Sequence, residues 1–262
     1  MEIKGKIIIV TGAASGIGRG LCQRFAKEGA QAVIAADVNE AGAKETAAEI
    51  KGDALLCDVS KEDDVIRLAK FARDKYGRVD LVCSNAGILG APGGYEVAND
   101  IWQRIWEINV LAHVFVARAV IPDMIRQGGG AIMITASAAG LLSQIGSLPY
   151  SVTKHAAVGL AENLSITYGD QGIQIFLLCP QAVESEMTRG YAGGGVAGVD
   201  GLMKVEQLAD AVMESFAADE FLILPHKEVK SYMQRKAADY DRWLKGMRSL
   251  QQRFVSGGPL KK

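Results

Sequence analysis

Two side chains in this sequence are spaced so that they could exchange a proton with a substrate. Tyr150 follows Pro149, and Lys154 comes four positions later. If Pro149 opens a helix, Tyr150 and Lys154 share one helical face, one turn apart. A phenol beside an ammonium can give or take a proton near neutral pH, because the positive charge stabilises the phenolate. A third hydroxyl, Ser137, ends an apolar run thirteen positions before the tyrosine. The stretch from Ser137 to Lys154 therefore indicates acid–base chemistry.

A glycine-rich turn near the N-terminus is suited to a phosphate group. The β-branched run Lys6–Val10 is followed by Thr11-Gly12-Ala13-Ala14-Ser15-Gly16-Ile17-Gly18 and then by a helical pattern to about Lys27. Glycines let the backbone turn tightly and approach a phosphate, and the helix N-terminus supplies N–H donors. The spacing G-x-x-x-G-x-G differs from the usual dinucleotide fingerprint, and glycines alone also suit an ordinary tight turn.

Asp37 indicates that this turn belongs to a dinucleotide-binding site. It ends the expected second strand, Gln31–Ala36, nineteen positions after the last glycine of the turn. An acid at this distance binds the ribose hydroxyls of NAD and repels a 2′-phosphate. No basic residue stands at Ser15 or Val38 to pair with such a phosphate. The sequence therefore predicts NAD(H) rather than NADP(H). The alternative role for Asp37 is to cap the helix that begins near Asn39.

Strands and helices are predicted to alternate along the chain. After the first two strands, further strands are expected at residues 53–57, 79–84, 131–135, 172–178 and 221–224. Near-continuous apolar strands alternating with helices predict a parallel sheet covered on both faces. Ligands bind such sheets at the carboxyl ends of the strands, where the glycine turn, Asp37, Asp58 and Asn85 fall. Ser60 is expected to cap the helix after the third strand. We predict one domain over residues 1–262, with a helical tail at 226–254.

Composition narrows the class of protein and its partners. The chain has 262 residues, 49% hydrophobic and 23% charged, with a net charge of -1, so neither nucleic acid nor an anionic membrane is expected as a partner. No run approaches the roughly 18 apolar residues of a spanning helix, and the N-terminus lacks the pattern of a signal peptide. The four cysteines are scattered, which predicts free thiols in a cytoplasmic protein and no metal site; they are Cys22, Cys57, Cys83 and Cys179.

The ordered set of motifs resembles the short-chain dehydrogenase/reductase family along nearly the whole chain up to the seventh strand. The residues that carry the resemblance are the run Thr11–Gly18, Asp58, Asn85-Ala86-Gly87, Asn109, Ser137, Tyr150 and Lys154. The resemblance implies an α/β fold with a Rossmann-like, doubly wound, seven-stranded parallel sheet and helices on both faces. It also implies a nicotinamide cofactor.

The family resemblance also assigns roles to a catalytic group of four residues. Ser137 would donate a hydrogen bond to the substrate oxygen, and Tyr150 would exchange the proton. Lys154 would lower the Tyr150 pKa and hold the nicotinamide ribose, while Asn109 would hold a water in a proton relay to solvent. The expected cofactor contacts are Gly12, Ser15, Gly16, Ile17, Gly18, Asp37, Asp58, Val59, Asn85, Ala86, Gly87, Tyr150, Lys154, Pro180, Val183 and Ser185.

The substrate pocket is where the sequence departs from the family. Gln181 follows Pro180, where the family usually has glycine, so its amide either enters the pocket or points outward. The segment from Ser185 to Ala197 is expected to be a mobile loop or lid. Apolar residues around Tyr150 favour a hydrophobic or aromatic secondary alcohol and its ketone. The candidate substrate contacts are Ser137, Leu141, Gln144, Tyr150, Gln181, Met187 and Tyr191.

The C-terminal part resembles members related to prostaglandin dehydrogenase rather than members with a glycine-rich end. The apolar stripe of the tail is expected to pack on the domain, to form a subunit interface or to cover the substrate, and a homodimer or homotetramer is expected. The leading hypothesis is an NAD-dependent oxidoreductase acting on CH–OH donors. The alternatives are an NADPH-dependent reductase of 3-oxoacyl or steroid-like ketones, and a regulatory protein that binds NAD without turnover.

Overall fold

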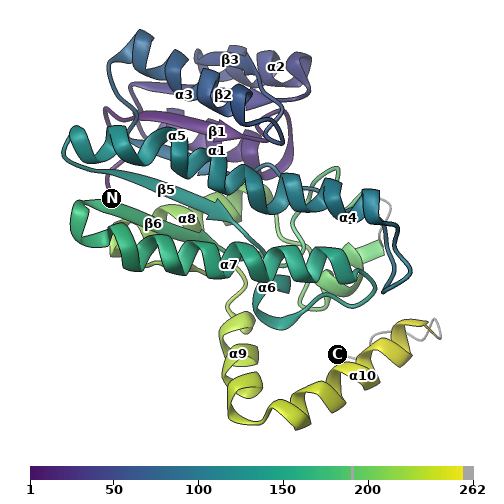
Figure 1. The fold of residues 1–262 in the computed structure, drawn as a ribbon. Helices are drawn as coiled ribbons and strands as arrows, with labels where there is room; N and C mark the ends of the chain where they lie inside the picture. The colour runs from purple at the N-terminus through teal and green to yellow at the C-terminus, as the bar shows by residue number, and fades with distance from the viewer. Residues whose placement is uncertain (190–191, 256–262) are drawn as a thin grey trace.

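Seven parallel strands form one sheet in the computed structural model, which describes residues 1–189 and 192–255 (Figure 1). The strand order is β3-β2-β1-β4-β5-β6-β7. The strands are β1 Ile7–Thr11, β2 Ala32–Asp37, β3 Asp53–Leu56, β4 Leu81–Ser84, β5 Gly130–Thr135, β6 Ile173–Leu178 and β7 Leu222–Ile223. The predicted fold class is confirmed, and each strand lies within one or two residues of its predicted bounds.

Helices cover both faces of the sheet because each carries an apolar stripe on one side. One layer contains α1 Gly16–Lys27, α2 Glu40–Ile50 and α8 Val205–Ala218. Within it, Phe216 of α8 packs against Phe25 of α1 and Phe176 of β6. The other layer contains α3 Glu62–Tyr76, α5 Ala112–Arg126 and α7 Leu148–Tyr168, followed by the short helix η2 Gly169–Gln171. The four cysteines are free and buried in the core.

The order in which strands are added to the sheet reverses between β1 and β4. From β1 the chain builds outward to β2 and β3, and then returns to place β4 on the other side of β1. In a doubly wound sheet, the crevice at this switch point is where ligands bind, at the carboxyl ends of the strands. The glycine turn after β1 and the segment that begins at Asn85 after β4 therefore lie side by side.

The helix that carries Asn109 contains an irregularity that its sequence does not reveal. The helical run between β4 and β5 consists of α4 Asn99–Trp106, a π-helical turn η1 Glu107–Leu111, and α5. By length and composition this run could cross a membrane, but 56% of its most apolar window is buried inside the protein, as in a core helix. A π turn widens the helix by one residue and re-aims the side chains within it.

Ser60 does not cap α3, so that expectation was wrong. The N-cap residue is Lys61, and the Ser60 hydroxyl instead donates to Asp58 Oδ1 at 2.7 Å. Asp64, inside the first turn of α3, accepts the backbone N–H of Asp58 at 2.9 Å. Acidic side chains in the first turn of α3 thus stand at the helix N-terminus in place of the expected serine cap. The positive end of the helix dipole favours negative charge at this position.

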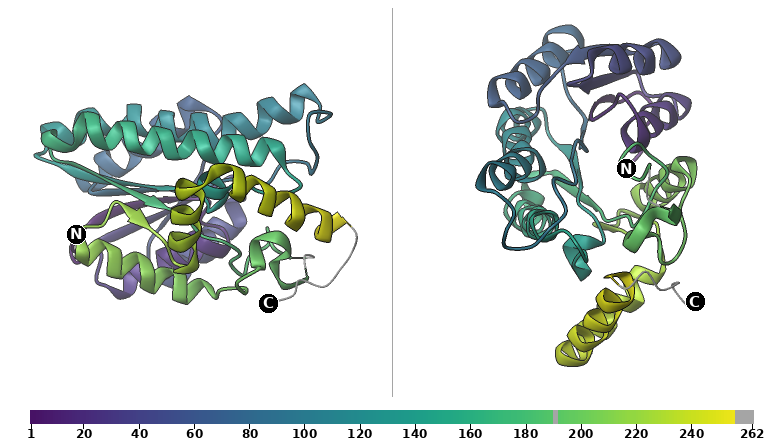
Figure 2. Two further views of the ribbon diagram at one scale, coloured as in Figure 1. Left: turned by 90° about the horizontal axis from the view of Figure 1, so that it is seen from below. Right: turned by 90° about the vertical axis from the view of Figure 1, so that its right-hand side faces the viewer.

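The C-terminal tail forms two helices that project from the sheet as an arm (Figures 1 and 2). They are α9 Glu228–Ala238 and α10 Tyr240–Val255. Side chains of the arm, Val229, Tyr232, Met233 and Trp243, pack with Ala138, Leu141, Leu142 and Leu224. The short helix α6 Ala139–Leu142 therefore supports the arm. A further element, the 3-10 segment η3 Ala192–Gly198, lies between β6 and α8 along the chain. The predicted packing of the tail on the domain is confirmed for these residues.

Candidate active site

The glycine turn after β1 is built so closely that side chains would not fit. A Cβ on Gly18 would lie 2.1 Å from the Gly12 carbonyl oxygen, and one on Gly12 would lie 2.9 Å from the Cα of Ala86. Ser15 precedes α1 without capping it through its side chain. The first N–H groups of α1 have no carbonyl partner within the helix, so they are available to an anion beside the turn.

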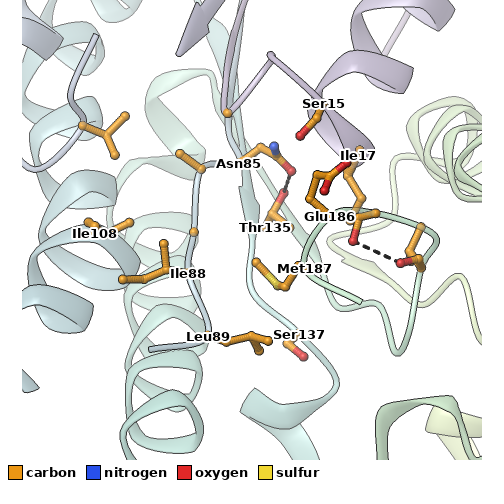
Figure 3. Close-up of a pocket in the computed structure, with 18 of the residues that line it drawn as sticks. Ser15, Ile17, Asn85, Ile88, Leu89, Ile108, Thr135, Ser137, Glu186 and Met187 are labelled. Carbon is orange, nitrogen blue, oxygen red and sulfur yellow. Dashed lines mark hydrogen bonds between the residues drawn. The ribbon is translucent and has the colours of Figure 1, made fainter. Parts of the chain in front are cut away.

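Asn85 ties three strands together at the floor of the same crevice. Its Nδ2 donates to the Thr11 carbonyl oxygen of β1 at 3.0 Å, and its Oδ1 accepts from Thr135 Oγ1 of β5 at 3.1 Å (Figure 3). The Thr11 hydroxyl in turn accepts the backbone N–H groups of Asn85 and Ala86, at 3.0 and 3.2 Å. This network fixes the backbone against which a ligand would lie, and gives Asn85 and Ala86 a structural role.

Asp37 faces the glycine turn from the end of β2. Its Oδ2 accepts the N–H of Ala14 at 2.9 Å and its Oδ1 accepts that of Asn39 at 2.8 Å. The cap of α2 is Asn39, whose side chain accepts the N–H of Gly42 at 3.2 Å. Asp37 is therefore not the cap that the alternative hypothesis required. Each of its carboxylate oxygens keeps a further lone pair for a hydroxyl donor.

These elements enclose a cleft of about 610 Å³ at the carboxyl ends of the strands. All sixteen residues predicted to contact the cofactor line it, from Gly12 in the first turn to Ser185 beyond β6. Ser15 and Ile17 lie at one end, and Leu89, Met187 and Ser137 at the other (Figure 3). The cleft gathers the residues; their contacts with a cofactor stay a prediction.

Several residues of the cleft were missed by the sequence reasoning. Thr135 ends β5 and Ala136 follows it, so their place at a strand end was the signal that could have found them. The others carry no motif that marks them: they are Val38, Cys57, Ile88, Gly90, Arg104, Ile108, Glu186 and Thr188. Arg104 and Ile108 come from α4 and η1; the rest belong to the segments that follow the strands, where side chains vary without changing the fold.

Ser137, Tyr150 and Lys154 meet at one end of this cleft, and all three are buried, with 9%, 8% and 3% of their surfaces exposed. α7 supplies Tyr150 and Lys154 from one face, with Pro149 in its first turn as expected. The Ser137 hydroxyl donates to the Pro180 carbonyl oxygen at 3.3 Å and accepts the N–H of Ala139 at 3.0 Å. Those contacts hold the serine hydroxyl beside the tyrosine.

The Lys154 ammonium lies beside the Tyr150 ring and is directed at a backbone carbonyl. Its Nζ donates to the Thr135 carbonyl oxygen at 3.0 Å and lies 5.6 Å from the centre of the Tyr150 ring. Burial lowers the Lys154 pKa to about 8. Burial also raises the Tyr150 pKa, and a hydrogen bond with Ser137 lowers it in part. Burial dominates the Tyr150 pKa in this arrangement and the ammonium is directed at a backbone carbonyl, so the expected lowering of that pKa by Lys154 stays a prediction.

Asn109 is fully buried behind the cleft rather than lining it. Its Oδ1 accepts the N–H of Ile88 at 2.9 Å, and its Nδ2 donates to the Ile88 carbonyl at 2.9 Å and to Thr153 Oγ1 at 3.3 Å. A Cβ on Gly87 would lie 3.2 Å from Asn109 Oδ1 and 3.4 Å from Lys154 Nζ. The π turn thus brings Asn109 and Lys154 to the same glycine, while the predicted water relay stays a prediction.

A second, smaller cavity of about 240 Å³ opens between α6 and the C-terminal arm. Ser137 and Gln181 line both cavities, so the two cavities meet at these residues. Its other lining residues are mostly apolar and come from α6, η3 and α10; they include Leu142, Val196, Trp243, Met247 and Leu250. The tail therefore borders a space that continues from the reacting end of the cleft.

The predicted substrate residues separate into three groups. Ser137, Tyr150, Gln181 and Met187 line the larger cleft, and Gln144 lines the second cavity. Leu141 lines neither, because its side chain packs into the core and under the arm, so its expected place in the pocket was wrong. Tyr191 lies outside the described residues.

A family model for short chain dehydrogenases matches residues 6–193 of this sequence. The chain belongs to the short-chain dehydrogenase family. It is 35% identical over 238 residues to 1-deoxy-11-beta-hydroxypentalenate dehydrogenase of Streptomyces exfoliatus, covering 88% of this chain and 86% of that protein. It is 33% identical over 219 residues to 3beta-hydroxysteroid dehydrogenase 2 of Eggerthella lenta, covering 75% and 84%.

The same family relation is visible in solved structures. A short chain dehydrogenase/reductase from Burkholderia phymatum in complex with NAD superimposes with a TM-score of 0.84 and 26% identity, covering 92% of this chain and 96% of that chain. As a short-chain dehydrogenase, the protein is an oxidoreductase that acts on hydroxyl or keto groups. The expected likeness of its C-terminal part to members related to prostaglandin dehydrogenase stays a prediction.

The cleft of this short-chain dehydrogenase has the features that a dinucleotide needs. The interlocked glycines leave open backbone where side chains would block a diphosphate, and the N-terminus of α1 adds N–H donors. Asp37 keeps acceptor capacity at the far end. The residues present therefore fit a nicotinamide dinucleotide.

Proposed function

We propose that this short-chain dehydrogenase transfers a hydride between NAD(H) and a hydrophobic or aromatic secondary alcohol or its ketone. The observation that carries the proposal is the burial of Ser137, Tyr150 and Lys154 together at one end of a cleft whose other end contains the glycine turn and Asp37. When bound, the nicotinamide supplies the hydride chemistry. The protein supplies proton transfer, orientation and shielding from water.

In the direction of alcohol oxidation, the Tyr150 phenolate takes the hydroxyl proton of the substrate. Ser137 donates a hydrogen bond to the same oxygen, which lowers the free energy of the alkoxide character that develops there. Lys154 contributes a positive charge near the phenolate, and its buried ammonium also reaches the Thr135 carbonyl. In the reverse direction Tyr150 gives its proton to the ketone oxygen. Asn109 holds the loop at Ile88 and, through it, the wall beside Lys154.

A preference for NAD(H) is supported by the carboxylate at the end of β2. Asp37 accepts two backbone N–H groups and has acceptor capacity left for ribose hydroxyls. A 2′-phosphate at the same place would meet its negative charge, and Ser15 and Val38 beside it offer no positive one. The complex of the Burkholderia phymatum relative with NAD is consistent with this preference.

An apolar substrate is supported by the side chains around the reacting end. Leu89 and Met187 lie near Ser137 in the larger cleft (Figure 3), and Leu142, Trp243 and Leu250 line the adjoining cavity. The two relatives named above act on a hydroxylated pentalenate and on a 3beta-hydroxysteroid by their names. We therefore place the substrate among alicyclic or aromatic secondary alcohols.

The test is a panel of secondary alcohols and their ketones, each assayed with NAD(H) and with NADP(H). We expect turnover of alicyclic or aromatic members and a higher kcat/KM with NAD(H). A clear preference for NADPH with 3-oxoacyl or steroid-like ketones would replace the proposal with the alternative enzyme. Binding of NADH without turnover of any member would instead favour a regulatory protein.

We further propose that the protein works in the cytoplasm as a homodimer or homotetramer, with a small-molecule alcohol or ketone as its partner. The scattered free cysteines and the net charge near zero support this setting. Light scattering of the purified protein gives the oligomer size, and a monomer would contradict the proposal.

A further inference from the structure

Gln181 stands where the two cavities meet, next to the catalytic serine. It follows Pro180, whose carbonyl oxygen accepts the Ser137 hydroxyl at 3.3 Å and the Ala138 N–H at 2.8 Å. Its side chain lines both the larger cleft and the cavity under the arm. A group on the substrate close to the reacting carbon would therefore meet this amide.

The orientation of the amide is set by a carboxylate. Gln181 Nε2 donates to Asp200 Oδ2 at 3.0 Å, and the hydroxyl of Tyr232 on α9 donates to Asp200 Oδ1 at 2.8 Å. An ionised carboxylate only accepts hydrogen bonds, so the NH₂ end of the amide must face Asp200. Burial and Asp200 raise the pKa of Tyr232 to about 12, which keeps its phenol protonated and able to donate. The arm thus holds the amide through a shared carboxylate.

The other end of the amide has no partner. Gln181 Oε1 is covered from solvent and accepts no hydrogen bond from the described part of the chain. The backbone N–H of the same residue is already donated to His226 Nδ1 at 3.2 Å. A covered acceptor without a donor is unfavourable and is uncommon in folded proteins. A small rotation of the Gln181 side chain would turn Oε1 toward the two cavities that the residue lines; a substrate O–H or N–H would then remove that penalty, whereas an ether or carbonyl oxygen would add repulsion.

We infer that Gln181 presents its amide oxygen to the substrate, and that the substrate carries a second hydrogen-bond donor beside its reacting carbon, as in a vicinal diol or a hydroxyketone. Asp200 and Tyr232 are positioning residues that fix this orientation. The apolar remainder of the substrate occupies the cavity between α6 and α10, bordered by Trp243 and Leu250. The inference rests on the proposed function and narrows its substrate class.

Three probes that differ at one position test the inference: indane-1,2-diol, 1-indanol and 2-methoxyindan-1-ol. Their affinities for the full-length protein saturated with NADH are measured by calorimetry, so that the readout does not depend on turnover. We expect the diol to bind tightest and the methyl ether weakest, with about tenfold between them for one hydrogen bond gained. Equal affinities, or no binding of the diol, would overturn the inference.

Variants test whether the preference for the diol over the ether depends on the Gln181 amide and on its orientation. Gln181→Met should bring the ratio of diol to ether affinity close to one. Asp200→Asn should lower this ratio, because an asparagine amide can accept or donate and lets the Gln181 amide turn over. Tyr232→Phe should lower it less, and Tyr240→Phe, the same change on the arm outside the cavity, should leave it unaltered. NADH affinity should stay the same in all four. An unchanged ratio in Gln181→Met would remove the residue from substrate recognition.

The same probes separate this inference from the proposed function. Oxidation of all three alcohols with NAD, without a preference for the diol, would support the proposed function and contradict the inference about Gln181. Tight binding of the diol without NADH formation from any alcohol would instead count against the proposed function.

Discussion

The buried charge of Lys154 is unfavourable for folding, and its removal should stabilise the cofactor-free protein while abolishing its chemistry. Burial lowers the pKa of this lysine from 10.5 to about 8. At about 1.4 kcal/mol for each pKa unit, holding the ammonium inside the protein costs about 3 kcal/mol at neutral pH. Lys154→Met keeps the length of the side chain and removes the charge. It also loses the hydrogen bond to the Thr135 carbonyl, which offsets roughly 1–2 kcal/mol. The variant should therefore be about 1–2 kcal/mol more stable at pH 7.

The difference in stability between Lys154→Met and wild type should become smaller as the pH rises. The folded-state pKa of Lys154 lies below its unfolded value, so the penalty is fully present below about pH 8, where both states are protonated. Above that pH the folded protein releases the proton and the unfolded chain does not, so wild-type stability rises relative to the variant. The gain of Lys154→Met should accordingly shrink between pH 8 and pH 10.5.

Urea unfolding of the cofactor-free wild type and variant, at pH 7 and at pH 10, measures both effects. Lys27→Met, at an exposed position on α1, is the matched control and should show neither the gain nor its pH dependence. Alcohol oxidation by Lys154→Met should fall to the background rate. A variant that is less stable at pH 7, or whose gain grows with pH, would refute the assignment of a buried ammonium to this position.

Three further predictions follow from the cleft. Asp37→Ala should weaken NAD binding and relax discrimination against NADP, as measured by the ratio of kcat/KM for the two cofactors; an unaltered ratio would count against its role at the ribose. Gly18→Ala should abolish NADH binding or folding, because its Cβ would lie 2.1 Å from the Gly12 carbonyl oxygen; fluorescence titration and circular dichroism distinguish the two, and a wild-type result in both would mean that the turn is not so closely packed. The rate of alcohol oxidation should rise with pH, because burial raises the pKa of Tyr150 and only its phenolate accepts the proton; a flat profile with hydride transfer rate-limiting would exclude a tyrosine base.

The sequence was most informative where function depends on spacing within one element or at a strand end. Tyr150 and Lys154 share a face of α7 because four residues make about one helical turn. Asp37 and Asn85 reach the cleft because parallel strands end at one edge of the sheet. These relations are local or topological, so the pattern of residues alone specifies them.

Other features depend on contacts that no local pattern records. The π turn at Asn109 has the same apolar periodicity as an ordinary helix, and nothing in the sequence marks the extra residue. The bond from Lys154 to the Thr135 carbonyl depends on how deeply α7 packs on the sheet. Gln181, Asp200 and Tyr232 come from three separate segments and meet only through the path of the arm. Tertiary packing determines such contacts. It also places the Leu141 side chain against the core and the arm instead of in the expected pocket.

The central claim is that Tyr150 moves the proton while NAD accepts the hydride. Tyr150→Phe removes one oxygen from a buried ring and leaves the glycine turn, Asp37 and Ser137 in place. The most direct measurement is single-turnover NADH formation from an alcohol identified in the panel, followed by fluorescence in wild type and variant at saturating NAD. NADH affinity should be largely unchanged, and the rate should fall by roughly 10²–10⁴-fold, the contribution of general acid–base catalysis. An undiminished rate in Tyr150→Phe would contradict the claim.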